Sequence, residues 1–98
     1  MDVSIIIVNY NTEKLVIDCI NSIINKTTKI NYEIIVVDNN SDNDSFNKII
    51  DTFPISTYTN TSCLDIKFIR NEKNIGFGLA NNEGFKQAKG KYLFCLNP

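Results

Sequence analysis

The chain contains no histidine and no tryptophan, and its three cysteines lie far apart, at positions 19, 63 and 95. No pair has the CxxC spacing of a zinc site, and an odd number of scattered cysteines does not suit a disulfide framework. Cys19 and Cys95 lie in apolar patterns, so we expect buried thiols there, and we expect Cys63 in a polar loop. Zinc binding and disulfide stapling are therefore poor candidates for organising this fold.

A strong charge of either sign is also missing. The chain has 10 basic and 11 acidic side chains, a net charge of -1, so no long-range field would recruit nucleic acid or an anionic membrane. No apolar run approaches the roughly 20 residues needed to cross a bilayer, and no basic segment precedes the apolar start. We therefore expect one soluble, cytoplasmic domain over residues 1–98 that does not bind nucleic acid.

Glycine is scarce, with 4 residues, of which Gly76 is the first. A dinucleotide-binding fold needs GxGxxG directly after its first strand, and a Walker A loop needs glycines at the same place. The sequence there is "NYNTEK", residues 9–14. A phosphoacceptor receiver domain would need acidic residues after the first strand and an aspartate after the third, where this chain has Asn9 and Asn71. These three classes are disfavoured.

Short apolar runs alternate with helical patterns along the chain. We expect strands at 3–8, 32–38, 65–71 and 91–98, and helices at about 12–26, 46–53 and 77–89. Residues 55–64 have no clean period and are expected to form a surface excursion, and Gly90 is expected as a left-handed helix cap. The alternating order predicts an α/β fold, a doubly wound, mostly parallel four-stranded sheet with three helices.

Polar residues follow each predicted strand, where doubly wound sheets bind their ligands. The second strand ends in "DNNSD", residues 38–42, which turn and helix-capping chemistry could explain on its own. A carboxylate at this place could also accept the N3 imino proton of uracil or thymine, with nearby asparagines supplying further hydrogen bonds. Asp38 is therefore a candidate for reading a pyrimidine base, and both interpretations remain open.

Three segments together resemble a known family. "SIIIVNYN" at 4–11, "EIIVVDNNSDND" at 33–44 and "NIGFGLANNEGFKQAKGKYLFCLNP" at 74–98 are similar, in this order and spacing, to the nucleotide-binding half of family 2 glycosyltransferases, the inverting GT-A class. The ending "LNP" resembles the rhamnosyltransferase-like branch. The likeness covers nearly the whole chain apart from residues 55–64.

The resemblance implies a Rossmann-like, truncated GT-A domain of a bacterial polysaccharide-synthesis enzyme. The longer parent would transfer a sugar from a UDP- or dTDP-sugar to a glycan or lipid-linked acceptor with inversion, from the cytoplasm or from the surface of the inner membrane. The nucleotide-binding residues that it implies are Asn9, Tyr10, Asn11, Asp38, Asn40, Asn74, Gly76, Asn82 and Asn97.

Two departures from the family pattern affect the expected chemistry. Asn81 stands where many relatives carry arginine, and Asn97 stands where most have the first acidic residue of "LDxD". In the "LNPD" branch the aspartate that binds the divalent metal, Mg or Mn, comes one residue later, beyond Pro98. The resemblance thus implies no catalytic residue and no metal ligand within this chain, which would be inactive alone. The alternative is a non-catalytic module that binds nucleotide weakly or self-associates through an exposed sheet face.

Overall fold

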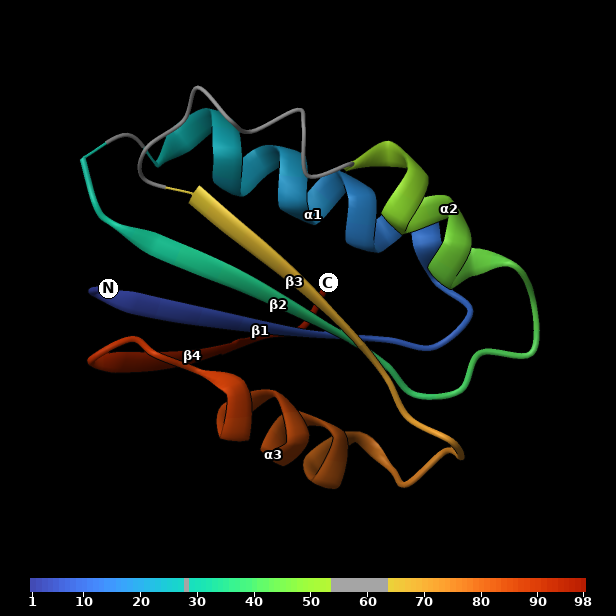
Figure 1. The fold of residues 1–98 in the computed structure, drawn as a ribbon. Helices are drawn as coiled ribbons and strands as arrows, with labels where there is room; N and C mark the ends of the chain where they lie inside the picture. The colour runs from blue at the N-terminus through green and yellow to red at the C-terminus, as the bar shows by residue number, and fades with distance from the viewer. Residues whose placement is uncertain (28, 54–63) are drawn as a thin grey trace.

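The computed structural model describes residues 1–27, 29–53 and 64–98, and it shows four strands and three helices in alternation (Figure 1). These are β1 (Val3–Asn9), α1 (Glu13–Lys26), β2 (Tyr32–Asp38), α2 (Ser45–Thr52), β3 (Leu64–Arg70), α3 (Phe77–Gln87) and β4 (Tyr92–Leu96). The predicted elements agree with these to within two residues at each end. The surface excursion expected from residue 55 onward and the loop cysteine Cys63 lie outside the described residues.

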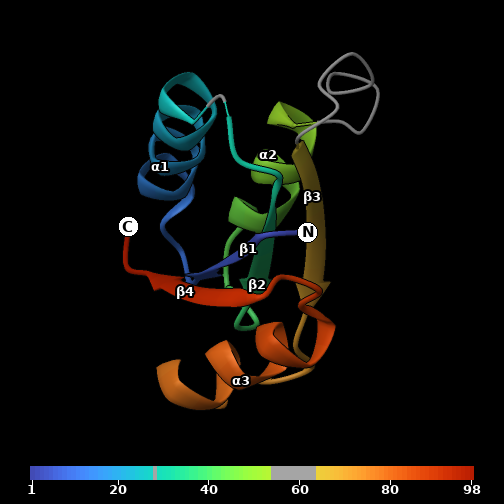
Figure 2. The ribbon, with the colours of Figure 1, turned by 90° about the vertical axis from the view of Figure 1, so that its left-hand side faces the viewer.

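The strands form one sheet in the order β3-β2-β1-β4, and every pairing is parallel. Helices α1 and α2 cover one face and α3 covers the other (Figure 2). The predicted doubly wound α/β fold is therefore confirmed. Because the strand order reverses between β1 and β4, the carboxyl ends of these two strands border the crevice in which such folds bind ligands.

The core has two apolar layers, one on each side of β1 and β2. On the first side Val16, Ile20 and Ile49 pack against alternate residues of the central strands, among them Ile7, Ile34 and Val36. On the second side Ala80 packs against the intervening residues, Ile6, Val8, Ile35 and Val37. The near-continuous apolar character of "SIIIV" and "EIIVV" follows from this, since both faces of each strand are covered.

A polar network fastens the turn between α3 and β4 to the sheet. Glu33 is fully buried and accepts hydrogen bonds from the Ser4 hydroxyl (2.5 Å) and the Lys89 backbone N–H (2.6 Å). The Lys67 ammonium lies 3.0 Å from its other oxygen, and the Gly90 N–H donates to Ser4 Oγ at 2.8 Å. Gly90 does not adopt the expected left-handed conformation, which among the described glycines only Gly76 has. Its role is to allow close approach to β1.

This network makes stability depend on pH. Burial by itself raises the pKa of Glu33, but hydrogen bonds from Ser4 and Lys89 and the hydrogen bond and charge of Lys67 outweigh it and lower the pKa below the usual 4.5. The ionised carboxylate therefore stabilises the fold above pH 4.5, and that contribution is lost as the pH falls through the lowered pKa. Glu33→Gln should lower the free energy of unfolding by about 1 to 3 kcal/mol near neutral pH, and by less at about pH 3.5. Urea unfolding of the variant and of the unmodified chain at the two pH values measures this difference in stability. A difference that does not depend on pH would contradict the prediction.

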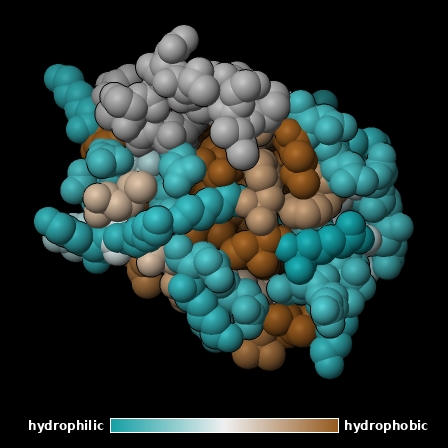
Figure 3. All heavy atoms as spheres, in the orientation of Figure 1, coloured by the Kyte–Doolittle hydropathy of each residue, from teal (hydrophilic) through white to brown (hydrophobic). Residues whose placement is uncertain are grey.

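The edge strand β4 is exposed. Leu93 and Phe94 are 51% and 55% accessible, and Cys95 is exposed rather than buried as expected. Leu93 and Cys95 share a face with Ser4 and Ile6, and on that face α3 packs over β1 and β2, not over β4. Cys19 is half-buried, and burial raises the pKa of its thiol. Figure 3 shows brown apolar side chains gathered in one band between polar ones on the face it displays.

Candidate functional site

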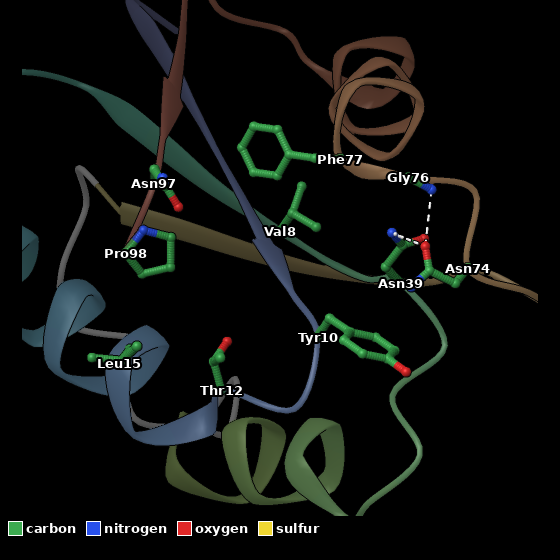
Figure 4. Close-up of a pocket in the computed structure, with 10 residues that line it drawn as sticks. All are labelled: Val8, Tyr10, Thr12, Leu15, Asn39, Asn74, Gly76, Phe77, Asn97 and Pro98. Atoms are coloured by element: carbon green, nitrogen blue, oxygen red, sulfur yellow. Dashed lines mark hydrogen bonds between the residues drawn. The ribbon is translucent and has the colours of Figure 1, made fainter.

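A cavity of about 390 Å³ opens at the carboxyl ends of β1 and β4, in the crevice that the strand order creates. Its lining comes from both strand ends, from the start of α1, from the residue after β2 and from the start of α3 (Figure 4). The lining residues are Val8, Tyr10, Thr12, Leu15, Asn39, Asn74, Gly76, Phe77, Asn97 and Pro98. None of their side chains carries a charge, and these side chains offer amides, two hydroxyls, aromatic rings and aliphatic groups.

The structure brings only some of the predicted site residues to this cavity. Tyr10, Asn74, Gly76 and Asn97 line it. The predicted residues that do not line it are Asn9, Asn11, Asp38, Asn40 and Asn82. Six further residues line the cavity although the sequence did not predict them as nucleotide-binding: Val8, Thr12, Leu15, Asn39, Phe77 and Pro98. The apolar members of this last group look like ordinary core residues in the sequence, so no signal marked them.

Asp38 is fully buried and its two carboxylate oxygens are engaged within the protein. Oδ1 accepts hydrogen bonds from Asn9 Nδ2 (2.8 Å) and Ser41 Oγ (2.7 Å), and Oδ2 accepts one from the Ser41 backbone N–H (3.0 Å). The half-exposed Arg70 adds its Nε at 3.8 Å and rests over the Phe46 ring. In this structure Asp38 therefore stabilises the loop after β2 by accepting hydrogen bonds within the protein. The base contact expected of it stays a prediction.

Asn9 belongs to the same buried cluster. Its Nδ2 donates to Asp38 and to Ser45 Oγ at 2.9 Å, while its Oδ1 accepts from the backbone N–H and the hydroxyl of Thr12. These bonds tie the end of β1 to the start of both helices on that face. Asn9 thus supports the residues of the cavity wall rather than lining the cavity.

Asn39, the residue after Asp38, lines the cavity, whereas Asp38 does not. Asn39 is 3% exposed; its Nδ2 donates to Asn74 Oδ1 at 2.9 Å, and its Oδ1 accepts from Ile75 N at 3.1 Å and Asn71 Nδ2 at 3.2 Å. Side chains at successive positions of a strand point to opposite faces of the sheet, so the sequence could have predicted that Asp38 and Asn39 face different sides. Asp38 shares parity with Val36, which packs toward α1 and α2, whereas Asn39 shares parity with Val37, which packs toward α3.

The two loops beside the cavity are latched together by Asn11. This residue has a left-handed φ of 57°, and its Oδ1 accepts hydrogen bonds from the backbone N–H groups of Asp42 and Asn43. Its own N–H donates to Ser41 Oγ at 3.0 Å. Asn40, with φ 62°, turns the second loop. Asn11 and Asn40 thus shape the loops without facing the cavity.

Tyr10 directly follows β1, is 38% exposed and lines the cavity. Its hydroxyl donates to Asp42 Oδ2 at 2.8 Å. This hydrogen bond, together with the negative charge of Asp42 and slight burial, raises the pKa of Tyr10, although the amides of Asn11 and Asn74 act in the opposite direction. The phenol is therefore protonated at neutral pH and serves as a fixed aromatic wall.

The remaining predicted positions lie on α3 and at the end of β4. Asn82 is exposed on α3 and away from the cavity. Asn81, at the position where relatives carry arginine, is buried; its Nδ2 donates to the Phe77 carbonyl at 3.1 Å, and its oxygen has no partner among the described residues. Asn97 is exposed and lines the cavity at the end opposite Asn39 (Figure 4).

Neither a metal cluster nor a membrane span is found in the part of the chain that the structure describes. Over residues 1–27, 29–53 and 64–98, no three or more histidine, cysteine, aspartate or glutamate side chains gather into a group that could hold a metal ion. Across the same ranges, each helix falls short of the length and apolar character that crossing a bilayer requires.

Comparison with known proteins points to one family. The sequence model for "Glycosyl transferase family 2" matches residues 4–98. The chain is 35% identical over 98 residues to the poly(ribitol-phosphate) beta-glucosyltransferase of Bacillus spizizenii, covering 99% of this chain and 14% of that protein. It is 31% identical to the glycosyltransferase GlyG of Streptococcus pneumoniae, covering 97% of this chain and 29% of that protein.

Solved structures share the fold. The S. aureus TarS 1-349 structure in complex with UDP-GlcNAc superposes with a TM-score of 0.79 at 27% identity, over 99% of this chain and 26% of that one. A mannosyltransferase from Pyrobaculum calidifontis, solved with GDP-Man and Mn²⁺, superposes with a TM-score of 0.74 at 18% identity, covering 93% of this chain and 25% of that one, which shows the fold alone.

The chain thus spans less than a third of each of these relatives. The match to the family model nevertheless runs over almost all of its residues. Together with the parallel sheet and the cavity at its switch point, this match confirms the resemblance drawn from the three motifs and places the chain in an enzyme family. The chain belongs to glycosyl transferase family 2.

Proposed function

We propose that the cavity binds the nucleotide of a UDP- or dTDP-sugar, and that this domain supplies the donor-binding half of a longer glycosyltransferase. The observation that carries the proposal is the cavity itself. It lies at the topological switch point, it is lined by the exposed Tyr10 ring and by amides, and it has no charged side chain in its wall. Aromatic faces and amides are the groups that bind a base, since every base offers a face for stacking and an edge for hydrogen bonds.

The relatives support this assignment. TarS, which is similar over nearly the whole of this chain, has been solved with UDP and with UDP-GlcNAc. The similarity to a poly(ribitol-phosphate) beta-glucosyltransferase favours a polymer as the acceptor. We propose transfer with inversion to a glycan or lipid-linked acceptor for the longer protein, with the transfer occurring on the cytoplasmic side of the membrane.

A divalent metal, expected from the resemblance and bound as Mn²⁺ in the mannosyltransferase, has no donor set in the described part of the chain. Asn97, the residue after β4, lines the cavity, and no aspartate or glutamate side chain lines it. A single amide does not hold Mg²⁺ or Mn²⁺, which prefer several oxygen ligands including carboxylates. The described residues therefore do not fit the metal, and the proposal is limited to binding of the base and ribose.

Substitution of the exposed tyrosine tests the proposed site. Tyr10→Ala should weaken UDP binding about tenfold, since base stacking on an aromatic ring contributes about 1 to 3 kcal/mol. Tyr10→Phe should retain most of the affinity because the ring remains. Tyr92→Ala is the matched control, since Tyr92 is 72% exposed at the other end of β4. Isothermal titration with UDP measures the affinity of all three variants. Equal losses of affinity in Tyr10→Ala and Tyr92→Ala would contradict the assignment of the binding site to this cavity.

Self-association is a second candidate function. The exposed β4 strand, with Leu93, Phe94 and Cys95 accessible, favours it because an open edge offers unpaired backbone groups to another strand. This candidate requires oligomers that form without nucleotide, whereas the first requires a nucleotide complex. Sedimentation velocity with and without UDP separates the two.

A further inference from the structure

We propose that Glu33 positions two walls of the nucleotide cavity from the other end of the sheet, by holding the turn between α3 and β4 against the central strands. Glu33 does not line the cavity. It is the second residue of β2, and the strand from Glu33 to Asp38 spans about 17 Å. Glu33 is therefore a positioning residue, which acts on the ligand through other residues. This inference rests on the proposed function, because it assumes that the cavity binds a nucleotide.

The start of α3 and the end of β4 form two walls of the cavity. Gly76 and Phe77 line it at the start of α3, and Asn97 and Pro98 line it after β4. Figure 1 shows α3 running back along the sheet to the turn at residues 88–91, and β4 returning from that turn toward the cavity. A helix and a paired strand are stiff, so a shift of the turn that joins them reaches their far ends. The position of the turn thus sets the spacing between the two walls.

Glu33 and Ser4 accept backbone hydrogen bonds from this turn. The Lys89 N–H donates to Glu33 Oε2 at 2.6 Å, and the Gly90 N–H donates to Ser4 Oγ at 2.8 Å. The Ser4 hydroxyl in turn donates to the same Glu33 oxygen at 2.5 Å, so one carboxylate oxygen organises both attachments. Glu33 and Ser4 are fully buried on the central strands β2 and β1. The turn is therefore fastened to the middle of the sheet.

An amide cannot replace this carboxylate. After Glu33→Gln, the single side-chain oxygen can face either the Lys67 ammonium or the Lys89 N–H, because these donors lie on different oxygens of Glu33. The amide N–H groups then face a donor on the other side. Either orientation leaves a donor without its acceptor, which is costly in a buried site. Glu33→Gln therefore weakens the attachment of the turn while preserving the size of the side chain.

Lys67, on the neighbouring edge strand β3, keeps Glu33 ionised. Its Nζ lies 3.0 Å from Glu33 Oε1, and among the described residues this oxygen has no other partner. Burial raises the pKa of Glu33, whereas hydrogen bonds from Ser4 and the Lys89 N–H, and the hydrogen bond and charge of Lys67, lower it. The other charged side chains that the described chain places at this end of β1, β3, α3 and the turn are exposed: Asp2, Asp65, Lys86, Lys89 and Lys91. Lys67→Met should therefore raise the pKa of Glu33 and release the turn at a higher pH than in the unmodified chain.

Glu33→Gln tests the positioning role through two measurements on the folded variant. Its affinity for UDP should fall about fivefold, as expected for a change carried through packed elements. Its amide signals at Phe77 and Asn97 should shift in the free chain, although Glu33 contacts neither residue. Ile49→Val is the matched control, because it removes a buried methyl group in the layer under α2, away from α3 and β4. This control should lose stability and keep its affinity for UDP.

A pair of Lys67 variants adds a pH profile, which a role in stability alone would not change. Lys67→Met removes the charge beside Glu33, and Lys67→Arg keeps it. The ratio of their UDP dissociation constants, measured from about pH 7 to about pH 4, cancels the titration of the nucleotide phosphate. The affinity of Lys67→Met should fall relative to that of Lys67→Arg as the pH decreases, because Glu33 becomes protonated earlier in Lys67→Met.

The outcomes separate the positioning role from the proposed function. Equal UDP affinity in Glu33→Gln and Ile49→Val overturns the positioning role and leaves the proposed function intact. A ratio for the two Lys67 variants that stays constant with pH does the same. The Lys67 pair decides if Glu33→Gln does not fold, since the Lys67 side chain lies on an edge strand and is 27% exposed. An unmodified chain that binds no UDP at millimolar concentration overturns the proposed function and the positioning role with it.

Discussion

Gly90→Ala is expected to destabilise the domain by about 3 kcal/mol, the upper end of the usual cost of overpacking and a large part of the stability of a chain of this size. A Cβ at this position would lie 2.5 Å from the Ser4 backbone nitrogen and 2.6 Å from the Val3 carbonyl carbon. Both atoms belong to β1, a central strand paired on both sides, and cannot move without disturbing the sheet. Relief by moving the turn instead would break the hydrogen bonds from Gly90 to Ser4 and from Lys89 to Glu33.

Gly78→Ala provides the matched control. Gly78 lies inside α3, where a Cβ would meet nothing within 4 Å. The same substitution there should stabilise the domain by about 0.5 to 1 kcal/mol, because alanine favours the helix. Urea unfolding of both variants measures the two effects. Similar free energies for Gly90→Ala and Gly78→Ala would show that the turn does not press against β1 as the structure has it.

Asp38→Ala is expected to cost about 3 to 5 kcal/mol, because it removes a buried carboxylate and leaves its donors unpaired. The donors are Asn9 Nδ2, the Ser41 hydroxyl and the Ser41 N–H, with Arg70 nearby. The loss should appear in the free energy of unfolding without any ligand present. A residue whose main role was to contact a base would affect affinity and leave the stability of the free protein nearly unchanged.

Asp42→Ala is the control for this prediction. Asp42 lies in the same loop but is exposed, and its carboxylate accepts a hydrogen bond from the Tyr10 hydroxyl. Its removal should cost less than about 1 kcal/mol, the usual limit for exposed polar contacts. Asp38→Ala with an equally small cost would mean that the fold does not need its carboxylate, which would favour the predicted direct contact with the base.

The sequence predicted the fold well because its signals were strong and local. "SIIIV" and "EIIVV" are apolar enough to be covered on both faces, and the helical stripe through Val16 and Ile20 could pack only on such a sheet. The alternation of strands and helices then left a parallel sheet as the simple solution. The exact ends of the strands and helices could not be predicted from the local sequence pattern; β4, for example, ends at Leu96.

The site was predicted only in part because it depends on where side chains point. Asp38 was singled out for its chemistry, yet strand parity turns it toward α2 and leaves the cavity wall to Asn39. Phe77 and Val8 read as core residues, although Phe77 is 50% exposed beside the cavity. Cys95 was expected to be buried because its neighbours are apolar, but burial of an edge strand depends on what covers it.

The central claim is that this cavity binds a nucleotide through its base, and amide chemical-shift mapping of the 98-residue chain with UDP tests it most directly. The account predicts saturable shifts at Tyr10, Asn39, Asn74 and Phe77, with little change at Asn31, which precedes β2 at the amino ends of the strands. No shifts with millimolar UDP, or shifts confined to residues remote from the cavity, would contradict it.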